Sequence, residues 1–121
     1  MQNSLKHIAL LVCICVSCNS VQDNVIIDAS NPNIKLNNGI LYYNNIPFSG
    51  DLITHYQNKL LKSDIEYING KKYGFEKHWN IDSDLVVERY YFKGKKTGIH
   101  KAWWNNGNLK FEYHFNEKGE Y

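Results

Sequence analysis

The chain has 121 residues, of which 43% are hydrophobic, and a formal net charge of +2 at pH 7. This length allows one domain at most, and so mild a positive charge excludes a groove built for nucleic acid. Tyr, Trp and Phe together make up 14% of the chain. None of them precedes Tyr42, which favours β-strands over helices in that part of the chain.

The N-terminal segment differs in composition from everything that follows. Lys6 precedes an uninterrupted apolar run from Ile8 to Val16. This run is too short to cross a bilayer as a helix, which needs about 20 residues. A positive start, a short apolar run and small residues before a polar segment are typical of an export signal. We therefore predict a signal peptide over residues 1–17.

The end of the apolar run, Val16-Ser17-Cys18, resembles the lipobox of bacterial lipoproteins, with Cys15 where that family usually has Leu. The resemblance implies that Cys18 becomes the lipidated first residue. It also implies anchoring in the bacterial envelope, on its periplasmic or cell-surface side. An ordinary signal peptide cut near Ser20 is the alternative. No cysteine follows Cys18, so the remaining chain has no disulfide and no thiolate chemistry.

Residues 18–38 are rich in Asn, Ser and Asp and are predicted to form a flexible polar spacer. Its one apolar island, residues 25–27, could form a short strand. From residue 39 onward, apolar and polar residues alternate in runs of six to eight, separated by clusters of turn formers. This pattern predicts that residues 39–121 form an all-β domain, an antiparallel meander of β-hairpins with about seven strands.

Within this domain the sequence repeats itself at a step of 24 residues. The residues that recur at this step include Gly50, Gly74 and Gly98, Gly70 and Gly94, Trp79 and Trp103, and Tyr67, Tyr91 and Phe115. A fixed period of this length is typical of stacked repeats. We predict that the glycines and tryptophans recur together because an aromatic ring covers the bare glycine backbone, which makes Trp79 and Trp103 core residues.

These spacings resemble the variant MORN repeat, N-G-K-x-x-G-x-x-x-x-W followed by N-G-x-L-x-x-E-x-x-Y/F. Residues 69–91 and 94–115 carry two copies, and residues 46–67 carry a degraded one. The resemblance covers residues 42–121 and implies a single-sheet repeat solenoid. Bacterial chains of this kind are often grouped with YwqK-type antitoxins, which are taken to neutralise a toxin by binding it. For an exported lipoprotein, this implies an immunity or binding role in the envelope.

The second strand of each repeat is predicted to have one packed and one polar side. The last strand places Leu109, Phe111, Tyr113 and Phe115 on the packed side. The polar side carries one acid per repeat, Asp64, Glu88 and Glu112, with His78, His100 and His114 expected nearby. Such a set could bind a metal or act in acid–base catalysis. The recurrence of one acid per repeat instead favours cross-strand pairing with Lys62, Lys110 and Arg89. We therefore predict a protein that is not an enzyme and has no metal or cofactor.

Two lysine pairs, Lys71-Lys72 and Lys95-Lys96, fall on turns at one edge of the predicted sheet. Lysines at such positions keep sheets soluble and discourage aggregation. Contact with anionic lipid is the alternative.

The consecutive residues Trp103 and Trp104 should point in opposite directions, so one of them leaves the core. We predict that Trp104, together with Tyr56 and Tyr90, forms the anchor of a non-catalytic protein-binding module. The expected partner is a toxin or an envelope protein. A module that binds glycan or a lipid surface is the alternative, and a hydrolase using the acids is the least favoured.

Overall fold

The structure is a computed structural model that describes residues 24–121, and it contains only β-strands in that range. The strands are β1 (Ile26–Asp28), β2 (Ile34–Asn37), β3 (Ile40–Tyr43), β4 (Ile46–Pro47), β5 (Gly50–His55), β6 (Leu61–Ile68), β7 (Lys71–Trp79), β8 (Leu85–Phe92), β9 (Lys95–Trp103) and β10 (Leu109–Phe115). The predicted signal peptide and Cys18 lie outside the described residues. Within them, no helix is long and apolar enough to cross a membrane.

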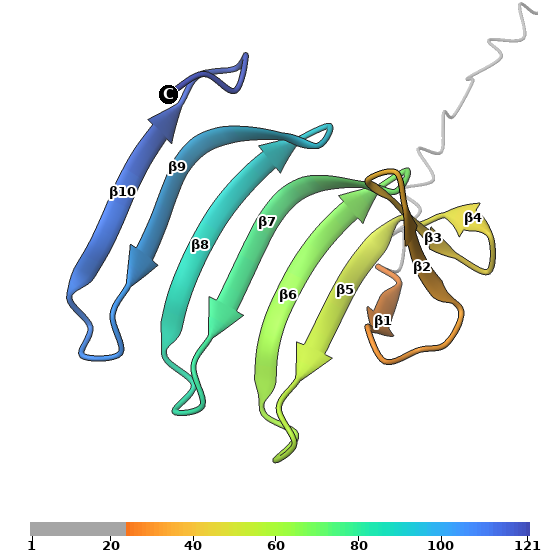
Figure 1. The fold of residues 1–121 in the computed structure, drawn as a ribbon, viewed down its shortest axis with the longest axis horizontal. Coiled ribbons are helices and arrows are strands. Elements are labelled where there is room, and N and C mark those ends of the chain that lie inside the picture. Colours follow the sequence, from red (N-terminus) through yellow and green to blue (C-terminus); the bar gives the residue numbers. More distant parts are fainter. Residues whose placement is uncertain (1–23) are drawn as a thin grey trace, which may run out of the picture.

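The strands form two sheets (Figure 1). The large sheet has seven strands in the order β1-β5-β6-β7-β8-β9-β10, and the small sheet has the order β2-β3-β4. From β5 to β10 each strand pairs antiparallel with the next, which confirms the predicted meander. Strand β1 pairs parallel with β5. The described part of the predicted spacer (residues 18–38) contains β1 and β2, so the folded part begins before residue 39.

The turns at the two ends of the large sheet differ. At one end, the two-residue turns Asn69-Gly70 and Lys93-Gly94 have positive φ at both positions, typical of type I′ hairpin turns. We call residues 68–73 and 92–97 the lysine turns. At the other end, residues 56–60, 80–84 and 104–108 form three tip loops. In each tip loop the amide of the first residue donates to the carbonyl oxygen of the fifth, at 2.8–2.9 Å.

The repeated glycines lie directly opposite aromatic residues of the next strand. The pairs are Gly50 with Tyr67, Gly74 with Tyr91, and Gly98 with Phe115. An aromatic residue therefore does accompany each glycine, but it is not the predicted tryptophan. Trp79 lies five residues further along the same strand as Gly74, roughly 16 Å away, which is too far to cover it. Trp79 pairs instead with Leu85, next to the tip loop.

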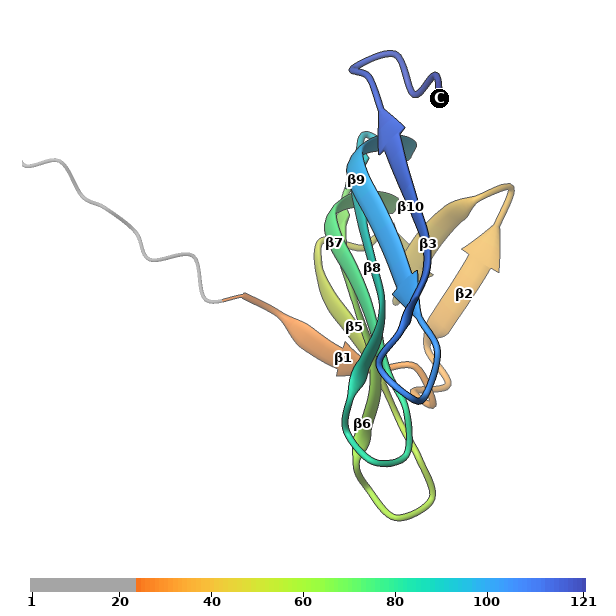
Figure 2. The same cartoon turned by 90° about the vertical axis from the view of Figure 1, so that its left-hand side faces the viewer.

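The two faces of the large sheet are covered differently. One face carries the buried residues Ser63, Tyr67, Glu76, His100 and Ala102, and we call it the packed face. Figure 2 shows the small sheet on one side of the large sheet. Leu41 and Phe48 from this part of the chain form a core with Ile27 and Tyr67. The small sheet therefore covers the packed face over the first strands of the meander. Strands β9 and β10 lie beyond it (Figure 1).

The opposite face, which we call the polar face, carries a row of alternating charges across five strands. The register places Asp64, Lys77, Glu88, Lys101 and Glu112 side by side in that order. The recurrence of one acid per repeat predicted cross-strand pairing, and this row is such a pairing. Its lysines come from the first strand of each hairpin, because only that strand lies directly opposite the acids.

The predicted partners Lys62 and Lys110 are therefore wrong, since each lies on the same strand as an acid. Arg89 is also wrong as a partner of these acids. It pairs with Glu76, which places it on the packed face.

Candidate aromatic binding surface

A chain of touching aromatic rings crosses the part of the packed face that the small sheet leaves open. Its successive centroid distances are 5.6 Å for Tyr91 to His100, 4.6 Å for His100 to Phe115, 6.2 Å for Phe115 to Tyr121, 5.1 Å for Tyr121 to Tyr113 and 4.9 Å for Tyr113 to Phe111. We call these six residues the aromatic strip. They come from β8, β9, β10 and the C-terminal residue.

The strip occupies repeat positions that are covered in the first repeat. Phe115 corresponds to Tyr67, which is 8% exposed and whose ring centroid lies 6.3 Å from that of Phe48. In the last repeat Tyr113 is 40% exposed, and Tyr121, which follows that repeat, is 84% exposed. The packed face of the large sheet is thus part of the core at the first hairpin and an open aromatic surface at the last hairpin.

His100 forms the buried base of the strip. Its Nε2 lies 2.8 Å from the carbonyl oxygen of Tyr90 and 3.2 Å from that of Thr97, and these two contacts favour a proton on Nε2 over the longer contact, 3.3 Å, in which Nε2 would accept the Tyr90 amide. Burial lowers the pKa of His100, against the two carbonyl groups, which favour its charged form. The buried, neutral imidazole packs against the Phe115 ring and restricts its position.

Glu76, one repeat before His100, anchors the other end of the strip. It is 4% exposed, and its carboxylate lies 2.6 Å from Lys72 Nζ, 2.8 Å from His78 Nε2 and 3.4 Å from Arg89 Nη1. Burial by itself raises the pKa of Glu76. Hydrogen bonds from His78, Lys72 and Tyr91, with the charge of Lys72, outweigh burial and hold the pKa well below its usual range. Burial and the Glu76 charge in turn raise the pKa of Tyr91 to about 12. Tyr91 is therefore a neutral, fixed ring at pH 7.

The structure does not bring the predicted anchor residues together. Tyr56 and Trp104 hold the same position in tip loops two repeats apart, roughly 19 Å across four strand spacings. The Tyr56 hydroxyl donates to the carbonyl oxygen of Trp79 at 2.8 Å. Tyr90 lies near the other end of the strands, where its ring packs 4.8 Å from that of Phe75. The sequence placed Phe111, Tyr113 and Phe115 on the packed side, but it gave no sign of where the cover ends.

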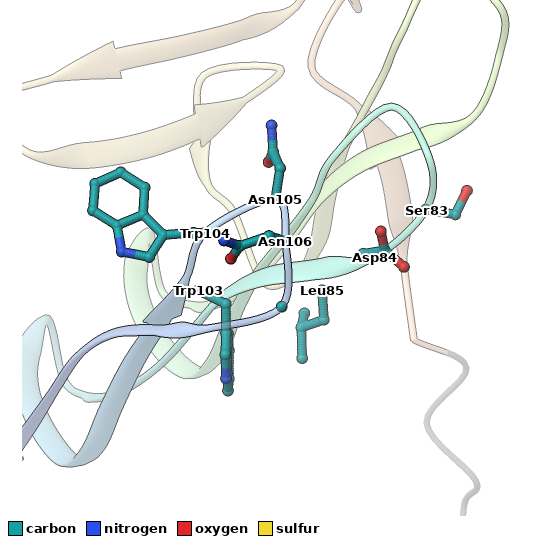
Figure 3. A pocket seen from close by; sticks show the side chains of 8 residues that line it. Ser83, Asp84, Leu85, Trp103, Trp104, Asn105 and Asn106 are labelled. Atoms are coloured by element: carbon teal, nitrogen blue, oxygen red, sulfur yellow. The ribbon is translucent and has the colours of Figure 1, made fainter.

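Trp103 and Trp104 border an open hollow at the third tip loop (Figure 3). The hollow has a volume of about 580 Å³ and is also lined by Asp84, Leu85 and Asn105. The two indole rings point in different directions, as the sequence predicted, and Trp104 points away from Leu85. Lys110 Nζ lies 4.3 Å from the centre of the Trp104 ring. Trp104 therefore presents a half-exposed ring beside a charge.

The predicted cluster of acids and histidines does not form. His114 Nε2 lies 2.7 Å from Glu112 on the polar face. His78 instead pairs with Glu76, and His100 is buried beneath the aromatic strip. Among residues 24–121, no group of three His, Cys, Asp or Glu side chains is placed to hold a metal ion.

Sequence reasoning missed a set of three neighbouring carboxylates on the polar face. Asp51 lies directly opposite Glu66, with Asp64 nearby. Burial raises the pKa of Asp51, and the charges of Asp64 and Glu66 add to this effect. Burial also raises the pKa of Asp64, with Glu66 acting in the same direction and Lys77 against it. One oxygen of Asp51 and one of Asp64 are buried without a hydrogen-bond partner in the described chain. Only the register of β5 and β6 reveals this arrangement.

We expect Asp51→Asn to stabilise the fold at pH 7. The folded state binds the Asp51 proton more tightly than the unfolded state, so wild-type stability falls as pH rises above the ordinary pKa of 3.8. The variant lacks this penalty, and its urea midpoint should exceed that of wild type at pH 7 and match it near pH 3. Asp82→Asn in an exposed tip loop is the control and should leave the midpoint unchanged. A lower midpoint for Asp51→Asn at pH 7 would contradict the prediction.

Fold and surface together define a single-layer β-hairpin repeat protein with one partly covered face. Comparison with family models, curated proteins and solved structures found no match to this chain.

Proposed function

We propose that this chain is a bacterial envelope lipoprotein, acylated at Cys18, whose MORN-variant repeats bind another protein without catalysis. The observation that supports this most is the aromatic strip. It is an open surface of touching rings on a face that the chain itself covers two repeats earlier. The partner is a toxin, in an immunity-like role, or another envelope protein.

The strip suits protein recognition for two physical reasons. Tyrosine supplies a large contact area with few rotatable bonds, and such residues often dominate binding energy at interfaces. The buried side chains of His100 and Glu76 contact Tyr91 and Phe115 and hold these two rings before binding, so little of their conformational freedom is lost on association.

The charge beside the strip indicates the chemistry of the partner. Lys72 Nζ lies 4.9 Å from the centre of the Tyr91 ring, and Lys96 Nζ lies 5.4 Å from that of Phe115. A partner surface with apolar side chains flanked by carboxylates would complement this pattern.

Photo-crosslinking tests this proposal with a matched pair of positions. Tyr113 is 40% exposed on the packed face, and Phe75 is 38% exposed on the polar face. A photoreactive phenylalanine placed at each position, in the full chain in its bacterial host, should form a discrete protein adduct at 113 and not at 75. With the partner identified from the adduct, Tyr113→Ala should weaken binding by about 2 kcal/mol, roughly 30-fold. Equal adducts at both positions, or none at 113, would count against the strip.

A second candidate function, glycan binding, is favoured by the hollow at the third tip loop. Its exposed Trp104 stands beside the side-chain amides of Asn105 and Asn106 (Figure 3), which combines a ring for stacking with groups that hydrogen-bond hydroxyls. Binding on a glycan array that is lost in Trp104→Ala and retained in Tyr113→Ala would favour it over the protein-binding proposal.

A further inference from the structure

The two ends of the large sheet carry different charges. The lysine turns contain Lys71, Lys72, Lys93, Lys95 and Lys96 and no acidic residue. The tip loops at the opposite end contain Lys59, Asp82 and Asp84. We call the first the lysine end.

The turns of the lysine end stack on one another, so their charges form one surface. The Gly94 amide donates to the Lys72 carbonyl oxygen at 2.8 Å, which fixes the second turn against the first. Lys71, Lys93 and Lys95 are exposed and form no ion pair within residues 24–121.

Carboxylates also lie at this end, including Glu117 and Glu120 of the turn that follows β10. Glu76 is bound by Lys72, Glu66 accepts the Phe75 amide at 2.5 Å, and Glu120 accepts the Asn116 side-chain amide at 2.9 Å. Lys118 lies in the same C-terminal turn as Glu117 and Glu120. The lysines at this end, Lys71, Lys72, Lys93, Lys95, Lys96 and Lys118, outnumber Glu66, Glu76, Glu117 and Glu120, so this surface has a net positive charge.

Exposed apolar side chains stand among these lysines. Ile68 and Phe92 are the first residues of the two lysine turns, and each is close to half exposed. Leu36, from the hairpin of β2 and β3, borders the same hollow as Lys71 and Lys93. Apolar side chains surrounded by lysines are typical of surfaces that rest in the headgroup region of a bilayer.

The chain enters the folded domain at this same end. The amide of Asp51 donates to the carbonyl oxygen of Val25 at 2.8 Å, and Gly50 lies opposite Tyr67, the partner of Lys72. Six residue steps separate Cys18 from Asn24, so even a fully extended chain spans only about 20 Å between them. If Cys18 is acylated, the lysine end cannot lie far from the membrane.

We propose that the lysine end rests on the anionic phospholipid headgroups of the membrane that holds Cys18. This inference rests on the proposed acylation of Cys18. The nine residues of β7 then hold the tip loops roughly 30 Å further from the lipid. In this orientation the large sheet is roughly perpendicular to the membrane plane, and a partner can reach the aromatic strip by approaching parallel to the membrane.

An amine footprint on the lipidated protein tests the orientation. The mature lipoprotein is reconstituted in vesicles of phosphatidylcholine alone or of phosphatidylcholine with phosphatidylglycerol. It is then treated with a water-soluble acetylating reagent, and each lysine is read by mass spectrometry. Lys71, Lys93 and Lys95 should react roughly five-fold more slowly in the anionic vesicles, as ~1 kcal/mol per surface lysine implies. Lys59, within a tip loop, and Lys110, beside another, are the internal controls and should react equally in both.

Two further arms complete the test. The protection should disappear in high salt, because exposed charges are then screened. In a triple variant, Lys71→Glu, Lys93→Glu and Lys95→Glu, the remaining lysines of the lysine end should also lose their protection from acetylation. Equal reactivity in both vesicle types, with an intact mass that shows an acylated Cys18, would overturn the orientation and leave the anchor standing. An intact mass without acyl chains would overturn both.

Discussion

Glu76→Gln is expected to lower the free energy of unfolding by roughly 2 kcal/mol at pH 7. Removing one partner of a buried ion pair costs more than an exposed pair is worth, because the remaining charges lose their counter-charge in a poorly hydrated site. The partners Lys72 and Arg89 are about one third exposed, which keeps the expected loss below that of a fully buried cluster. Urea unfolding at pH 7 measures it.

The loss should shrink in acid. The folded pKa of Glu76 is lowered, so its contribution is fully present above the ordinary pKa of 4.5 and declines progressively as pH falls below it. The difference between wild type and Glu76→Gln should therefore narrow between pH 7 and pH 3.

Glu112→Gln is the matched control, because Glu112 also contacts one lysine and one histidine. Its oxygens lie 3.2 Å from Lys101 Nζ and 2.7 Å from His114 Nε2, but on the exposed polar face. We expect no measurable loss from this change. Equal losses from the two substitutions would show that burial of the cluster contributes nothing.

Gly74→Ala is expected to lower the free energy of unfolding by roughly 3 kcal/mol, a fall of about 10 °C or more in the unfolding temperature. Gly74 has φ +89, a backbone conformation that side chains other than glycine adopt only with strain. The added Cβ would also collide with the Glu66 carboxylate, which accepts the Phe75 amide. Thermal unfolding followed by circular dichroism measures the change.

Gly98→Ala separates these two causes. Gly98 lies at the equivalent position with φ +64, within the left-handed region that L residues reach at a cost of about 1–2 kcal/mol. A Cβ there would lie 3.7 Å from Tyr90, an ordinary contact. We expect this variant to lose only about half as much stability as Gly74→Ala.

A double variant tests the collision directly. Gly74→Ala combined with Glu66→Ala should lower the free energy of unfolding by less than the sum of the two single changes. Strict additivity would show that the collision is unimportant.

The local features of the fold could be predicted because each depends on residues close in sequence. Asn69-Gly70 tolerates positive φ at both positions, so this hairpin turn follows from two residues alone. The 24-residue step fixed the equivalent strands, and alternation along a strand separated Ser63 and Tyr67 from Asp64. These patterns were sufficient for the antiparallel meander.

The candidate site depended on contacts that no local pattern carries. Tyr56 and Trp104 share a repeat position, and only the strand order shows that four strand spacings separate them. Likewise, Asp64 lies opposite Lys77 and Glu112 lies opposite Lys101 because of the register between neighbouring strands, which no local pattern shows.

The sequence by itself determined the hairpins, the turns and the two faces of the large sheet, because backbone preference and alternation act over a few residues. The tertiary structure alone decided which part of the packed face is core and which is surface. That outcome depends on Leu41 and Phe48 folding back over Tyr67, a contact between separate sheets. Phe115 repeats the chemistry of Tyr67 and remains at an open surface, because the small sheet ends before it reaches the last hairpin.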